Sequence, residues 1–320
     1  MKRKIVISVL VIFAIAMMGL IFIGNYFYDL AINSKTNKDF LNESKHLGSA
    51  DTSGNMSSHA ESKKLAQEWA VKKSTKQTIQ SFDDLKLNGY YFQNKKDNHK
   101  YIIVVHGYMG KALDMVFSIK RFYKEGYSVL AADCRGAGDS EGNYIGMGWD
   151  DRLDILKWID LIISNDPDAE IVLYGVSMGG ATVMMVSGEE SLPSNVKAIV
   201  EDCGYTSASD IFTYQLNDLF NLPKFPIIPA ASLVTKIRAG YFLEEASAVK
   251  KVAKSRTPIL FIHGDKDEFV PFSMLDTLYE AANSPKDKYV INGAGHGLAS
   301  SVDGEIYWDN VFNFIKQYMN

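Results

Sequence analysis

The stretch IVLYGVSMGGA, Ile171 to Ala181, joins a short apolar run to a serine that lies between glycines. The apolar run is typical of a buried strand, and Gly175 to Gly179 has the Gly-x-Ser-x-Gly spacing of a sharp turn from a strand into a helix. Such a turn either presents a nucleophilic serine or only connects two packed elements. The stretch alone leaves both interpretations open, so the rest of the chain has to supply the partners of a reactive serine.

Short apolar runs alternate with amphipathic segments over most of the chain. This pattern is typical of a mostly parallel sheet covered by helices on both faces, an α/β fold. The predicted strands are a short one near residues 78–81, then 86–92, 101–105, 127–131, 171–174, 197–201, 259–262 and 289–292. The predicted helices cover about 112–123, 149–163, a segment starting at 178, and two segments near 275–282 and 308–318.

Residues that can take part in catalysis are found where five of these predicted strands end. The carboxyl ends of parallel strands meet at one edge of a sheet, which is where ligands bind in open α/β sheets. A serine, an acidic residue and a histidine therefore fall at one edge, in that chain order. The five segments are HGYMG (106–110), DCRGAGDSEG (133–142), GVSMGG (175–180), HGDKDEFVP (263–271) and GAGHG (293–297).

These five ordered motifs resemble those of α/β hydrolases, from about Thr78 to the C-terminus. Within that superfamily the chain is similar to the membrane-anchored serine hydrolases of the Bem46-like group. The resemblance implies an α/β-hydrolase fold and cleavage of carboxylic esters with acyl or lipid-like groups through an acyl-enzyme. Two alternatives stay open: hydrolysis of amides, thioesters or peptides by the same residues, and a catalytically silent membrane-anchored binding module.

The chemistry of acyl transfer assigns a role to each candidate residue. Ser177 is the candidate nucleophile, and its hydroxyl needs a base such as His296 to take its proton. Asp267 would orient the imidazole ring and stabilise its charged form. The backbone N–H groups of Met178 and Tyr108 would receive the oxyanion of the tetrahedral intermediate.

Other residues compete for the acidic role. Asp265 lies two residues before Asp267 and could instead cap the following helix, and Asp202 follows another predicted strand. We favour Asp267 because the resembled pattern places its acid there. His106 and His263 each begin a tight His-Gly turn and are interpreted as structural.

The N-terminus predicts a membrane anchor. Nineteen almost uninterrupted apolar residues, Ile5 to Ile23, would form a helix of roughly 28 Å, close to the hydrocarbon thickness of a bilayer. Basic residues at 2–4 precede the run, which predicts that the catalytic domain lies on the extracytoplasmic side. A cleaved signal peptide is the competing interpretation, but the run is longer than usual for one, and the aromatic residues at 26–28 are typical of a membrane interface.

The predicted domain organisation follows from these features. Residues 1–28 form a cytoplasmic stub and a transmembrane anchor, and residues 29–77 form a polar linker or helical lead-in. Residues 78–320 form the hydrolase domain. The segment at about 204–256 is too long for an ordinary connection between strands and is expected to form a small helical cap.

Several classes of function are excluded by composition and spacing. The formal net charge of −4 and the pI of about 5.9 argue against a nucleic-acid partner. No cofactor and no metal are expected, since Gly136-Ala137-Gly138 lacks the third glycine of a dinucleotide loop and no pair of histidines or cysteines has ligand spacing. The expected partners are a lipophilic small-molecule ester and the membrane, and the oligomeric state is left open. In the resembled fold two other strands lie between the strands that end near Cys134 and Cys203. Three inter-strand steps give a separation of roughly 14 Å, which is too long for a disulfide, so both cysteines are expected to be free thiols.

Overall fold

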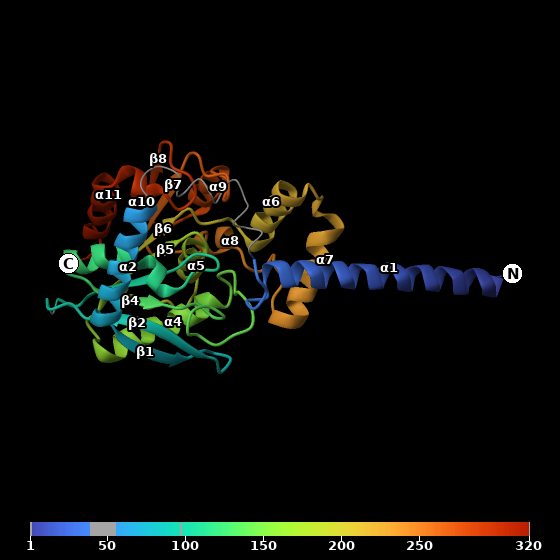
Figure 1. Cartoon of the computed structure of the whole chain (residues 1–320), viewed down its shortest axis with the longest axis horizontal. Coiled ribbons are helices and arrows are strands. Elements are labelled where there is room, and N and C mark those ends of the chain that lie inside the picture. Colours follow the sequence, from blue (N-terminus) through green and yellow to red (C-terminus); the bar gives the residue numbers. More distant parts are fainter. Residues whose placement is uncertain (1, 39–55, 97, 320) are drawn as a thin grey trace.

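A mostly parallel eight-stranded sheet forms the centre of the protein (Figure 1). The computed structural model describes residues 2–38, 56–96 and 98–319. The strand order is β1-β2-β4-β3-β5-β6-β7-β8, and only the pairs β1–β2 and β2–β4 are antiparallel. The strands are β1 (Thr75–Gln80), β2 (Lys86–Phe92), β3 (Lys100–Val105), β4 (Ser128–Ala132), β5 (Glu170–Val176), β6 (Val196–Asp202), β7 (Ile259–Gly264) and β8 (Lys286–Ile291).

Helices cover both faces of this sheet. Because successive side chains of a strand point to opposite faces, Ile103 and Val105 belong to one buried cluster and Ile102 and Val104 to the other. The first cluster includes residues of α4 (Asp151–Asn165), α5 (Met178–Ser187), α8 (Ala248–Val252) and α9 (Ser273–Ala281). The second includes residues of α2 (Met56–Lys73), the 3-10 turn η3 (Ala112–Met115), α3 (Val116–Glu125), α10 (Ala299–Asp303) and α11 (Glu305–Lys316). The predicted mostly parallel sheet with helices on both faces is confirmed.

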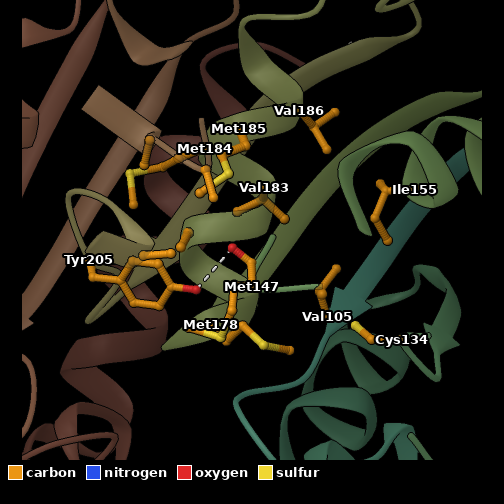
Figure 2. Packing of buried hydrophobic residues seen from close by; sticks show 14 of the residues in the cluster. Val105, Cys134, Met147, Ile155, Met178, Val183, Met184, Met185, Val186 and Tyr205 are labelled. Atoms are coloured by element: carbon orange, nitrogen blue, oxygen red, sulfur yellow. Dashed lines mark hydrogen bonds between the residues drawn. The ribbon is translucent and has the colours of Figure 1, made fainter. Parts of the chain in front are cut away.

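Helix α5 follows the opening stretch and is buried along its whole length. It has no polar face, so it can only be stable inside the core, between the sheet and the helices α4 and α8. Figure 2 shows the side chain of Met178 among other buried side chains of the same cluster, which also includes Cys134 and Tyr205. The Tyr205 hydroxyl donates a 3.1 Å hydrogen bond to the backbone oxygen of Met147 beside it (Figure 2). This packing fixes the N-terminus of α5, where Ser177 lies.

A helical cap stands between β6 and β7, within the segment where it was predicted. It consists of α6 (Ala208–Phe220) and α7 (Lys224–Ala239), whereas the later helix α8 packs on the sheet with α5. The long N-terminal helix α1 (Lys2–Ala31) projects from the domain on the side of α6 and α7 (Figure 1). It is long and apolar enough to cross a membrane, and its most apolar part is fully exposed.

The last turns of α1 pack into the hydrolase domain. Tyr28 and Ile32 are buried in the core, and the Ile145 amide donates a 2.8 Å hydrogen bond to the oxygen of Ile32. In α2, Trp69 stacks on Phe92 of the sheet, with ring centroids 5.6 Å apart. The segment 29–77, predicted as a linker or helical lead-in, therefore has packed parts at both ends, because its apolar side chains find partners on the domain. Its residues 39–55 lie outside the described residues.

The two cysteines are free and buried, as predicted. Cys134 follows β4 and Cys203 follows β6, and two strands, β3 and β5, separate these elements in the sheet. Burial raises the pKa of both thiols well above its ordinary value. Both cysteines therefore behave as core residues.

Candidate active site

Ser177 occupies a strained turn between β5 and α5. Its backbone has φ 58° and ψ −118°, a left-handed conformation that non-glycine residues rarely adopt. The turn is tight because two glycines flank it: a Cβ atom at Gly175 would lie 2.1 Å from the backbone oxygen of Gly179, and one at Gly179 would lie 2.1 Å from that of Val105. The serine hydroxyl is thereby held at the carboxyl edge of the sheet.

A chain of hydrogen bonds joins Ser177, His296 and Asp267. The Nε2 atom of His296 lies 2.9 Å from the Oγ atom of Ser177, and its Nδ1 atom lies 2.8 Å from Oδ2 of Asp267. Ser177 follows β5, Asp267 follows β7 and His296 follows β8, so three loops at one edge of the sheet supply the three groups. A hydroxyl, an imidazole and a carboxylate in this order can activate the serine oxygen for attack on a carbonyl carbon.

The carboxylate of Asp267 is held firmly in its ionised form. Its Oδ1 atom accepts hydrogen bonds from the backbone amides of Phe269 and Val270, at 3.0 and 2.8 Å. Burial alone would raise the pKa of Asp267, but hydrogen bonds from His263 and His296 outweigh it and lower the pKa to about 2. A permanent negative charge next to His296 can stabilise the imidazolium that forms when this ring takes a proton.

His263 is a member of the site that the sequence analysis missed. Its fully buried ring lies with Nε2 2.9 Å from the oxygen of Val270 and 3.2 Å from Oδ2 of Asp267. Burial lowers the pKa of His263, but the hydrogen bond and charge of Asp267, together with the charge of Glu201, produce a net rise. The sequence signal for this contact was that His263 lies four residues before Asp267. That spacing is compatible with a contact but does not require one.

The competing acidic residues lie elsewhere in the same region. Oδ1 of Asp265 accepts a 2.6 Å hydrogen bond from the Gly293 amide, so this residue ties two loops together and caps no helix. Oδ2 of Asp202 accepts a 2.9 Å hydrogen bond from the Tyr307 hydroxyl. Asp267 is therefore the carboxylate that hydrogen-bonds His296 in the described part of the chain.

The loop after β3 lies directly beside the serine. A Cβ atom at Gly107 would be 3.4 Å from Cβ of Ser177, in van der Waals contact with it. His106 fixes this loop: its Nε2 atom accepts a 3.0 Å hydrogen bond from the Cys134 amide, as expected of a structural residue. Tyr108 follows in the loop, and Met178 is the first residue of α5, so both predicted donor residues flank Ser177.

An apolar pocket extends from Ser177 between the cap and α1. The space between its walls, including the open mouth, is about 860 Å³. None of the described residues that line it carries a charge. The pocket's walls include Phe27, Leu30 and Ala31 of α1, Phe212 and Leu216 of α6, and Ile228 and Ala231 of α7.

The polar groups of this pocket are mostly engaged within the protein. The hydroxyls of Tyr108, Tyr205 and Thr235 and the amide nitrogen of Gln215 donate to backbone oxygens at 2.6 to 3.1 Å. A ligand in the pocket would therefore meet a mostly apolar surface, with the Ser177 hydroxyl and the Gln215 side-chain oxygen, which has no hydrogen-bond partner among the described residues, as its polar groups.

One group of potential metal ligands includes two residues of this site. Ligand atoms of Cys203, Asp267 and His296 lie within 4.8 Å of one another. The Nδ1 atom of His296 and a carboxylate oxygen of Asp267 are already paired at 2.8 Å, and burial raises the pKa of the Cys203 thiol. Since a metal needs both nitrogen and thiolate free, the arrangement fits a hydrogen-bonded triad better than a metal centre.

Known proteins share the fold and parts of the sequence. Residues 96–203 match the family described as serine aminopeptidase, S33. The uncharacterized protein YqkD of Bacillus subtilis is 26% identical over 230 residues, which cover 72% of this chain and 75% of that protein. The uncharacterized membrane protein YNL320W of Saccharomyces cerevisiae is 25% identical over 248 residues, covering 75% and 78%.

Solved structures give the same picture. The Pyrococcus furiosus esterase Pf2001 superposes with a TM-score of 0.62 at 23% identity, covering 77% of this chain and 92% of that one. The Pyrococcus horikoshii acylaminoacyl peptidase has a TM-score of 0.55 at 18% identity, covering 77% and 41%. These matches confirm the α/β-hydrolase fold, and the similarity to a yeast membrane protein fits the resemblance to the Bem46-like group.

Proposed function

We propose that this protein, an α/β hydrolase of the serine-hydrolase type, cleaves carboxylic esters that carry an apolar acyl group. The observation that carries the proposal is the 2.9 Å contact between Ser177 Oγ and His296 Nε2 at the end of an uncharged, largely apolar pocket. An acyl chain would occupy the pocket and bring its carbonyl carbon to the serine oxygen.

Each residue then has a role in the reaction. Ser177 Oγ attacks the ester carbonyl while His296 takes its proton, and Asp267 stabilises the resulting imidazolium. The amides of Met178 and Tyr108 bind the oxyanion of the tetrahedral intermediate. His296 then gives the proton to the departing alcohol, and an acyl-enzyme remains on Ser177. Water, activated by the same imidazole, releases the acid and restores the serine.

Peptide hydrolysis is the second candidate, and the family match favours it by name, as serine aminopeptidase. An aminopeptidase has to bind a positively charged amine, and no acidic residue lines the pocket. The missing negative partner for that amine supports the ester over the peptide.

Labelling with a fluorophosphonate tests the proposal. The wild-type chain should react, and the Ser177→Ala chain should not. Labelling that survives this substitution, or no labelling of the wild type, would exclude the serine as nucleophile and favour the catalytically silent binding module. A chain-length series of nitrophenyl esters beside matched anilides then separates ester from amide cleavage. Faster turnover of the anilides would favour the peptidase.

We further propose that the catalytic domain lies on the extracytoplasmic side. The support is the basic cluster Lys2 to Lys4 before the apolar part of α1, because basic flanks are retained in the cytoplasm. Digestion of intact cells or spheroplasts with an external protease tests the orientation. Protection of the domain would place it in the cytoplasm.

A further inference from the structure

Helix α7 is apolar on both of its faces. The inner face is buried and includes Ile227, Ile228, Ala231 and Val234. The outer face carries exposed apolar side chains four residues apart at Pro229, Leu233 and Ile237, and Phe225 is exposed in the non-helical start of α7. Phe225 and Ile237 are 76% and 75% exposed. A helix at a water-covered surface keeps polar residues on its outer face, so an apolar stripe here indicates a contact surface. We define the outer face of α7 by Phe225, Pro229, Leu233 and Ile237.

The place where α7 meets α1 indicates what covers this face. A Cβ atom at Gly24 would lie 2.6 Å from the backbone oxygen of Ala230, so the two helices touch at this glycine. The helices also meet at Tyr28 and Asp29, four and five residues further along α1. Arg238 of α7 forms a 2.9 Å ion pair with Asp29 and lies over the ring of Tyr28. Gly24 directly follows the apolar run that ends at Ile23. Helix α7 therefore crosses α1 at the level where the latter leaves the hydrocarbon of a bilayer.

The shape of the molecule agrees with this placement. In Figure 1, α6 and α7 lie on the side of the domain from which α1 projects towards its N-terminus. A bilayer around the projecting part of α1 would meet these two helices before any other part of the domain. Basic residues at both ends of α7, Lys224 and Arg238, are typical of helices that lie in a membrane interface.

We propose that the outer face of α7 contacts the bilayer that α1 spans, and that α7 separates this bilayer from the pocket beside Ser177. The opposite side of the same helix forms pocket wall through Ile228, Ala231 and Thr235. The substrate that fits this arrangement is an acyl ester lipid of that membrane, and this choice of substrate rests on the proposed ester hydrolysis. The contact itself does not depend on it.

Site-directed fluorescence quenching tests the contact in the full-length chain. Ile237→Cys and, as a control, Asp160→Cys at an exposed position of α4 are labelled with an environment-sensitive fluorophore. Cys134 and Cys203 are buried with raised thiol pKa values, so the reagent selects the introduced cysteine. The protein is reconstituted in phosphatidylcholine–phosphatidylglycerol vesicles with nitroxides either on the headgroups or on the acyl chains.

Acyl-chain nitroxides should quench the label at position 237 strongly and the label at position 160 hardly at all. Quenching at 237 by headgroup nitroxides alone, or equal quenching at both positions, would overturn the contact. The face would then be assigned to a protein partner or to a second copy of this chain. This readout needs no turnover, so it is independent of the proposed reaction.

A kinetic comparison tests the choice of substrate. The double variant Leu233→Asn and Ile237→Asn changes side chains that do not line the pocket. It should hydrolyse a long-chain ester embedded in vesicles about tenfold more slowly, since it loses two apolar side chains from the interface, and a short soluble ester at an unchanged rate. Equal losses with both esters, or no loss with either, would overturn delivery from the membrane. Absence of fluorophosphonate labelling in the wild-type protein would instead contradict the proposed function.

Discussion

The hydroxyl of Tyr108 donates a 2.6 Å hydrogen bond to the backbone oxygen of Ala31, the last residue of α1. This bond joins α1 to the loop whose backbone amide is a proposed oxyanion donor. The 2.8 Å bond between the Ile145 amide and the oxygen of Ile32 holds the same end of α1 from another side. The end of α1 therefore forms part of the wall of the site.

The substitution Tyr108→Phe separates the two contributions of this residue. It keeps the backbone amide but leaves the oxygen of Ala31 without its donor, which should lower the free energy of unfolding by about 1–3 kcal/mol. The kcat should fall far less than in Ser177→Ala. Thermal unfolding and ester turnover of the chain in detergent measure both effects. Tyr101→Phe is the control, because its hydroxyl bonds Asp166 with no contact to α1. A loss of activity as complete as that of Ser177→Ala would contradict a role through the amide.

Asp267→Asn tests the orienting carboxylate. An amide can no longer fix the imidazole tautomer or stabilise its charge, so kcat should fall by about 10⁴, as in a comparable serine hydrolase. Asp265→Asn is a matched control two residues away, since its carboxylate contacts the Gly293 amide and the exposed Lys266 but not His296. We expect Asp265→Asn to keep most of the activity in the same assay. If Asp265→Asn were the more damaging change, the acidic role would belong to Asp265.

The ionised state of Asp267 predicts how stability depends on pH. Its pKa is lowered from 3.8 to about 2 in the folded chain, because hydrogen bonds from His263 and His296 outweigh burial. A lowered pKa stabilises the fold at pH values above about 4, and this contribution, about 2 kcal/mol, is lost as the pH falls towards 2. Urea unfolding should therefore show a steeper fall for wild type than for Asp267→Asn between pH 5 and pH 2.5. Parallel curves would show that the carboxylate gains no stability from its neighbours.

Much of this architecture could be predicted from local sequence. Apolar runs such as 101–105 and the glycines around Ser177 report buried strands and a tight turn directly, since their conformation depends on near neighbours. The structure also brings Ser177, His296 and Asp267 into contact, although their roles stay proposals. Asp267 was preferred over Asp202 through the resemblance to α/β hydrolases, because spacing alone does not distinguish them.

The remaining features depend on tertiary contacts that no local pattern reports. The apolarity of α1 indicates a membrane helix, but it does not reveal that Ile32 and Tyr28 are buried in a domain whose strands begin at Thr75. The same holds for His263, whose contact with Asp267 follows from the path of the loop after β7. In both cases the local sequence already suggests one role, a membrane span for α1 and a His-Gly turn for His263. The second role, a contact within the domain, leaves no separate pattern in the sequence.

The depth of the pocket should set the preferred acyl length. Ala231 is a buried wall residue of α7, so Ala231→Phe would fill part of the pocket and shift the optimum of an ester series towards shorter chains. Leu233→Phe is the control on the same helix, because its side chain is exposed and lies outside the pocket. An unchanged length preference in Ala231→Phe would show that acyl chains bind elsewhere.

The contact between α1 and α7 can be tested with a pair of glycines in one helix. A Cβ atom at Gly24 would lie 2.6 Å from the backbone oxygen of Ala230, whereas one at Gly19 would have nothing within 4 Å. Gly24→Val should force the helices apart and lower the free energy of unfolding by about 1–3 kcal/mol, the usual cost of overpacking. Because α1 and α7 both line the pocket, turnover of long-chain esters should fall as well. Gly19→Val makes the same change in side chain and helix propensity and should leave both quantities unchanged. If both variants changed stability and turnover equally, the effect would come from the glycine substitution itself. The packing of α1 on α7 would then contribute nothing to the site.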